Sequence, residues 1–140
     1  MPSTNDLHAF ATRYFSFLDR RDISGLIANM FSPDCKFAGF GPEDLNNEGV
    51  CAAMEGFFAA FPDSNMPVDG VIAEGLSVAI RHRFEGTHRA PFNGIPATGK
   101  RVVVSATVTL NIENGKVRRG FLHADMLGLL VQLGAVPPPA

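Results

Sequence analysis

The stretch Lys116–Gly134, KVRRGFLHADMLGLLVQLG, decides the fold because it joins a strand to a short apolar helix. Alternate residues of a strand point to the same face of a sheet. Phe121, His123 and Asp125 are therefore expected to share one face. An imidazole and a carboxylate beside an aromatic ring are the components of a cavity that moves protons. This segment thus predicts an acid–base site around which the other elements build a dry pocket.

The region before this stretch has the two-residue periodicity of strands. Residues 67–73, 76–87 and 100–112 are predicted strands, and Asn114-Gly115 is the tight turn that follows the third. The alternation is clearest in 76–87, where Val78, Ile80, His82 and Phe84 occupy one face. A shorter strand is expected at 35–40, after a turn at 31–34.

The first third of the chain has helical spacing of its apolar residues. Helices are predicted from Ser3 or Asn5 to about Arg20, over 22–30 and over 50–61, and a short final helix over 126–133. Helices followed by a run of antiparallel strands predict an α+β domain, with the helices on one face of a curved sheet. We expect a single domain over residues 1–140, with a frayed, proline-rich tail at 135–140.

The composition restricts the partners of the protein. Its net charge is −2 and it has no run of lysines or arginines, so nucleic acid and anionic membranes are not expected partners. No apolar run approaches the roughly 18 residues that span a bilayer, and the N-terminus lacks the pattern of a secretory signal. A cytoplasmic protein is therefore expected, with Cys35 and Cys51 as free thiols.

The sequence contains no metal or cofactor motif. His123 and Asp125 supply two ligands on one face with His82 as a distant third, but HExxH and cysteine clusters are absent. Glycine-rich nucleotide loops and a serine nucleophile elbow are absent as well. We therefore expect neither a metal nor a cofactor.

Four motifs resemble those of the SnoaL-like polyketide cyclases, members of the nuclear-transport-factor-2-like superfamily. They are Gly86-Thr-His88, Phe92-x-Gly94-Ile-Pro96-x-Thr-Gly99, Asn114-Gly115-Lys116-Val117 and Asp125-x-Leu-Gly-Leu-Leu-x-Gln-Leu-Gly134. The resemblance implies a cone-shaped antiparallel sheet whose apolar cavity is closed by three N-terminal helices. It also implies homo-oligomers, dimers or tetramers, that pair through the sheet.

The resemblance further implies an acid/base role for Asp125, which stands just before the LGLL helix. In the characterised cyclases a carboxylate at that position promotes an intramolecular aldol ring closure. The family often has an acidic residue near 119 and tryptophan near 121, where this chain has Arg119 and Phe121.

Three residues are candidates for catalysis, and each also has a structural interpretation. Asp125 is either the base or the cap of the final helix. His123 either polarises a carbonyl or turns outwards at a bulge. His82 is either a core histidine or, at a position where the family carries a large ring facing the cavity, a proton shuttle.

Candidate substrate-binding residues surround these three. Tyr14 either donates to a substrate oxygen or makes a hydrogen bond in the core, and His88 either holds the loop after its strand or borders the cavity mouth. The remaining predicted contacts are apolar: Met30, Phe37, Phe57, Phe84 and Phe121.

The leading functional hypothesis is a cofactor-free cyclase or related lyase that acts on a small, largely apolar, enolisable carbonyl compound. One alternative is a non-catalytic module that binds an apolar molecule or serves as a scaffold. Another is a proton shuttle like ketosteroid isomerase, but the positions of its two carboxylates fall near Ala38–Gly39 and Thr107–Val108, which carry none.

Overall fold

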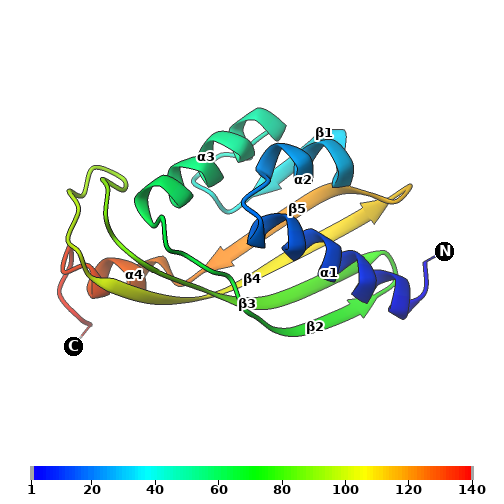
Figure 1. The fold of residues 1–140 in the computed structure, drawn as a ribbon. Helices are drawn as coiled ribbons and strands as arrows, with labels where there is room; N and C mark the ends of the chain where they lie inside the picture. The colour runs from blue at the N-terminus through cyan, green and yellow to red at the C-terminus, as the bar shows by residue number, and fades with distance from the viewer. Residues whose placement is uncertain (1, 140) are drawn as a thin grey trace.

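The computed structural model describes residues 2–139 and shows helices packed on one curved sheet (Figure 1). The predicted α+β class is confirmed. The elements in chain order are α1 Thr4–Asp19, α2 Ile23–Met30, β1 Phe31–Ala38, α3 Asn47–Ala60, β2 Val68–Glu74, β3 Ser77–Thr87, β4 Arg101–Glu113, β5 Lys116–Ala124 and α4 Met126–Gln132.

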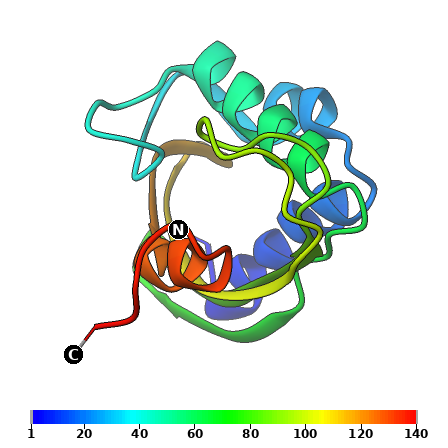
Figure 2. The same cartoon turned by 90° about the vertical axis from the view of Figure 1, so that its left-hand side faces the viewer.

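The five strands form one sheet in the order β1-β5-β4-β3-β2. The pairs from β2 to β5 are antiparallel, whereas β1 pairs with β5 in parallel, so the sheet is mixed. Figure 2 shows the sheet as a curved layer seen end-on, with α1, α2 and α3 facing its concave side and α4 at the near end. The sheet is not closed, and its concave face is the one that the helices cover.

Helix α1 begins where its sequence provides a capping box. The Ser3 side chain accepts from the backbone N–H of Asp6 at 3.1 Å, and the Asp6 carboxylate accepts from the backbone N–H of Ser3 at 2.9 Å. These two bonds satisfy donors that the first turn leaves without intrahelical partners. The cap fixes the start of the helix that brings Tyr14 to the sheet.

Strand β1 begins four residues earlier than the sequence predicts. The turn expected at 31–34 is wrong, because Phe31 already pairs with Val117 of β5. Phe31 is buried and its ring stacks on Tyr14 with centroids 6.1 Å apart. Pro33 is compatible with this strand because β1 lies at the edge of the sheet, where a missing backbone donor is tolerated. Tertiary packing therefore overrides the local turn signal.

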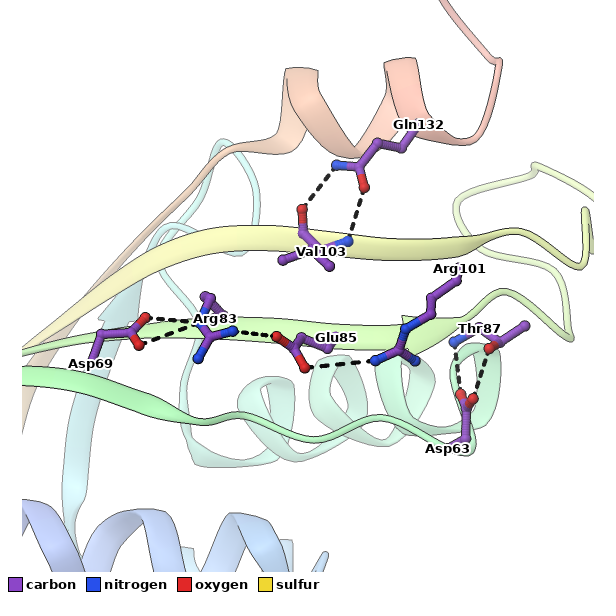
Figure 3. A network of polar contacts seen from close by, with 8 residues as sticks. All are labelled: Asp63, Asp69, Arg83, Glu85, Thr87, Arg101, Val103 and Gln132. Carbon is purple, nitrogen blue, oxygen red and sulfur yellow. Dashed lines mark hydrogen bonds and ion pairs between the residues drawn. The ribbon is translucent and has the colours of Figure 1, made fainter.

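Helix α4 completes the sheet beyond the end of β5. The last pair between β4 and β5 is Ala106 with Ala124, and from there β4 has no strand partner on that side. The Gln132 side chain of α4 donates to the carbonyl of Val103 and accepts from its N–H, both at 2.9 Å (Figure 3). One amide side chain thus takes the place of a neighbouring strand and holds α4 against β4.

Two hydrophobic clusters form the core. The larger lies between α1, α2, α3 and the sheet, and the smaller closes the end near α4 with residues such as Phe61, Phe84, Phe92 and Leu129. No helix within residues 2–139 is long and apolar enough to cross a membrane. Of the tail predicted to fray, residues 135–139 form neither helix nor strand, and residue 140 lies outside the described part.

A candidate active-site cavity

An apolar cavity lies between the helices and the concave face of the sheet. Its volume is about 70 Å³, roughly half that of a cavity of about 150 Å³ known to hold benzene. Of the residues predicted to bind or transform substrate, five line it: Tyr14, Phe37, Phe57, His82 and Phe84. Because the cavity is smaller than one that holds benzene, even a single aromatic ring requires wall side chains to move.

His82 is one of the two polar side chains in this wall. It lies on β3, where the strict alternation of the sequence directs it inwards, and only 6% of its surface is exposed. Its Nδ1 lies 3.2 Å from the carbonyl oxygen of Ile80. A carbonyl can only accept, so Nδ1 carries the hydrogen and Nε2 has the free lone pair.

The apolar surroundings keep His82 neutral. Burial lowers the pKa of its imidazole below the ordinary value of 6.5, an effect that the hydrogen bond to Ile80 and the charge of Asp69 partly offset. The ring also meets Phe15 of α1 edge-on, with centroids 4.9 Å apart. A neutral imidazole with one unshared nitrogen is suited to accept a proton.

Tyr14 is the second polar side chain in the wall. It is 3% exposed, and within residues 2–139 no hydrogen bond from its hydroxyl is found. Burial raises the pKa of the Tyr14 hydroxyl, so the group stays protonated across the physiological range. Its ring belongs to a stack that continues through Phe31 to Phe37. A fixed hydroxyl without a protein partner is available to donate to a ligand.

Strand β5 turns its predicted catalytic residues away from the cavity. Asn111 pairs with Arg119 and Ile112 pairs with Val117, so Arg118 is the extra residue of a bulge. The bulge reverses the alternation: Val117 is buried, and beyond it Leu122 and Ala124 face the cavity. Without Arg118 as an extra residue, the face that carries residues 119, 121, 123 and 125 would have pointed inwards, as Val117 does.

The expectation that Phe121, His123 and Asp125 share a face holds, but the placement of that face at the cavity is wrong. Asp125 is exposed and caps α4, accepting from the backbone N–H of Gly128 at 2.8 Å. His123 is exposed in a shallow depression on the outer surface, beside Thr107. The Phe121 ring lies under the guanidinium of Arg119, 5.1 Å from its centroid.

Comparison with known proteins identifies the family. The model of the SnoaL-like polyketide cyclases matches residues 8–133. The chain belongs to the SnoaL-like polyketide cyclase family. A search of curated proteins returns no match.

Solved structures share the fold of this SnoaL-like chain. AclR from Streptomyces galilaeus, for which a hydroxylase function is suggested, is 31% identical, with a TM-score of 0.87 over 96% of this chain and 100% of AclR. TsrD from Streptomyces laurentii is 24% identical, with a TM-score of 0.85 over 97% and 100% of the two chains. IdmH from Streptomyces antibioticus, a suggested polyketide cyclase, is 22% identical, with a TM-score of 0.78 over 91% and 97%.

Two further predicted contacts of this SnoaL-like protein lie outside the cavity wall. Met30, the last residue of α2, is fully buried in the core. His88 is also fully buried, where its Nδ1 accepts from the backbone N–H of Thr98 at 3.2 Å and its ring stacks on Phe61. His88 thus holds the 88–99 loop, the structural alternative that the sequence had offered.

Most of the apolar wall was not predicted from the sequence. The additional lining residues are Phe15, Leu18, Phe40, Met54, Phe58, Met66, Val104, Ala106, Val108, Leu122, Ala124, Met126 and Leu129. The signal was present in β4, whose even positions are apolar, and in α1, where Phe15 and Leu18 flank Tyr14 at helical spacing. In β5 the Arg118 bulge reverses the alternation, so the inward placement of Leu122 and Ala124 could not be predicted from the sequence.

The cavity wall contains no charged side chain. Within residues 2–139, no group of three or more histidine, cysteine, aspartate or glutamate side chains is placed to hold a metal ion. The arrangement therefore combines one proton acceptor, one proton donor and an apolar surface.

Proposed function

We propose that this protein is a cofactor-independent cyclase or related lyase that acts on an uncharged, largely apolar carbonyl compound with an acidic α-hydrogen. His82 serves as the general base and Tyr14 as the hydrogen-bond donor to the carbonyl oxygen. One observation carries the proposal: these are the two polar side chains of an otherwise apolar cavity. In such surroundings a hydrogen bond to a developing charge is stronger than in water.

The reaction is an intramolecular aldol addition. The Nε2 of His82 takes the α-proton, and the enolate oxygen that forms accepts a hydrogen bond from Tyr14. The enolate carbon then attacks a second carbonyl of the same molecule, forming the ring bond and an alkoxide. The imidazolium returns its proton to the alkoxide, so His82 is regenerated and the product is an isomer of the substrate.

The cavity supplies the proximity that this step requires. Phe37, Phe57 and Phe84 belong to its wall, and flat apolar surfaces of this kind fold an extended chain so that its reacting carbons meet. Because no charge lines the wall, a carboxylate or phosphate near the reacting atoms would lose hydration without compensation. The reacting part of the substrate is therefore uncharged.

The test is deuterium uptake at the α-carbon in D₂O, followed by mass spectrometry. The probes are uncharged aryl ketones and aryl β-keto esters, starting with α-tetralone. His82→Gln should lower catalysed exchange about 10²–10⁴-fold, and Tyr14→Phe about 10²–10³-fold. A probe that shifts the NMR signals of both residues yet never exchanges its α-hydrogen would make the protein a binding module instead.

Hydroxylation is a second candidate, favoured by the 31% identity to AclR, which exceeds the 22% identity to IdmH. In that reaction His82 would deprotonate a phenol, and dioxygen would attack the electron-rich ring carbon. An external two-electron reductant would convert the second oxygen atom to water. Incubation under ¹⁸O₂ separates the candidates, because a hydroxylated product gains one heavy oxygen atom and an aldol product gains none.

A further inference from the structure

A bulge in β2 places a carboxylate beside the backbone of His82. Val68 pairs with His82 and Gly70 pairs with Arg81, so Asp69 is the extra residue between them. Bulges redirect side chains and are common next to active sites. Here the bulge brings Asp69 to a depression on the outer surface that His82 and Arg83 also border.

The Asp69 carboxylate is held in place by an ion-pair network. The Nε of Arg83 donates to its two oxygens at 3.3 and 3.1 Å. Arg83 also donates to Glu85 at 2.5 Å, and Glu85 pairs with Arg101 at 3.6 Å (Figure 3). The four side chains alternate in charge along β2, β3 and β4. Asp69 is thus oriented by a neighbour of His82 on the same strand.

We propose that Asp69 and Arg83 form a charge pair that tunes the proton affinity of His82 from the opposite face of the sheet. This inference rests on the proposed role of His82 as the base. Asp69 is a positioning residue in this scheme, since it touches neither the cavity nor the ligand. Its negative charge favours the imidazolium that forms during the reaction, and Arg83 limits that effect.

Burial has the largest effect on the pKa of His82, and few other titratable or charged groups face it. From α1, Tyr14 lines the same cavity and stays protonated. From β3, Arg81 lies on the outer face with its guanidinium over Gly70 of β2, and from β5, His123 borders the outer depression. Strand β4 contributes only Ser105, Ala106 and Thr107 to that depression. Among the described groups, Asp69 is the charge that acts on the pKa of His82.

The pair predicts shifts of opposite sign. Asp69→Asn removes the negative charge beside His82 and leaves Arg83 paired with Glu85 alone, so the imidazole should bind its proton less readily. Arg83→Gln leaves the Asp69 carboxylate without its partner, so the imidazole should bind its proton more readily. The double variant should titrate between the two, because both charges are removed.

The experiment is an NMR titration of ¹³C-labelled histidine, practicable because the chain has only four histidines. His82→Gln identifies the His82 signal by its disappearance. Asp69→Asn should move the midpoint of that signal to lower pH and Arg83→Gln to higher pH.

The matched controls are Asp44→Asn and Arg119→Gln. These residues form an ion pair at 2.8 Å between the loop after β1 and β5, so they change net charge equally without touching β2 or β3. Shifts no larger than those of the controls, or shifts in the same direction in both test variants, would overturn the inference.

The titration uses no substrate, so its outcome is independent of the reaction. Opposite shifts with unaltered deuterium exchange in His82→Gln would leave the charge pair standing and remove the catalytic role. If the shifts are absent but His82→Gln loses deuterium exchange, the catalytic role of His82 stands and the charge pair is refuted. A purely structural role of Asp69 would lower the midpoint of thermal unfolding without moving the His82 titration.

Discussion

His82 and His123 are the same residue type on strands of one sheet, yet they lie in opposite environments. His82 is 6% exposed in an apolar cavity with a hydrogen bond that fixes its tautomer. His123 is exposed on the outer surface next to Thr107. The difference arises from backbone alternation, which is regular in β3 and reversed by the Arg118 bulge in β5. Residue type alone therefore does not identify a catalytic histidine, because the strand register decides which face it occupies.

The strongest test of this comparison replaces each histidine in turn. His82→Gln should reduce turnover about 10²–10⁴-fold, since a general base contributes that much. His123→Gln should leave turnover unchanged, because its ring is on the opposite face from the cavity. Steady-state kinetics of both variants measure the contrast. A large loss in His123→Gln would mean that the outer face takes part in the reaction.

The reversed alternation in β5 is tested at Gly120. A β-carbon there would lie 2.2 Å from the ring of Phe37, which is only 2% exposed, so the ring would have to move out of its packed position. Gly120→Ala should therefore lower the free energy of unfolding by about 1–3 kcal/mol through overpacking. Chemical denaturation measures the free energy of unfolding. Gly115→Ala is unsuitable as a control because Gly115 has a φ of +75°, a conformation that strains a residue with a β-carbon. Gly56→Ala, in open space on α3, is the suitable control. Equal stability of Gly120→Ala and wild type would contradict the inward placement of residue 120.

Asp125 separates a capping role from a catalytic one. Asp125→Ala removes the acceptor for the Gly128 N–H, and loss of such a cap costs about 1 kcal/mol. Turnover per folded molecule should stay at the wild-type level. Asp125→Ser, which retains a capping oxygen, should recover most of the stability. A turnover loss of orders of magnitude in both variants would restore the carboxylate to the reaction.

The smallest expected effect is the contribution of His82 to the pH dependence of stability. Because the pKa of buried His82 lies below the unfolded value of 6.5, the unfolded chain binds the proton more readily. Stability should therefore fall as the pH decreases from 6.5 to the folded pKa of His82, and no further below it. Denaturation curves across this range measure the loss, and His82→Gln should abolish it. The pKa values of the Asp6, Asp34 and Asp63 carboxyl groups are also lowered, but these groups reduce stability only as the pH falls from 3.8.

Much of the fold was predictable from local sequence. The alternation over 76–87 placed His82 and Phe84 on the inner face, and helical spacing placed Tyr14 on the buried side of α1. Asp125 was recognised as a cap for α4 as well as a candidate base. These predictions succeed because side-chain direction within one regular element follows from residue order alone.

The placement of the β5 residues was decided only in three dimensions. The Arg118 bulge depends on pairing with β4 on one side and β1 on the other, and β1 itself begins at a segment whose local signal is a turn. Phe37 of β1 needs the bare backbone of Gly120 beneath its ring. The chain by itself determines which residues alternate together. The packing of distant strands determines which of the two alternating sets is buried, because one extra residue exchanges the faces.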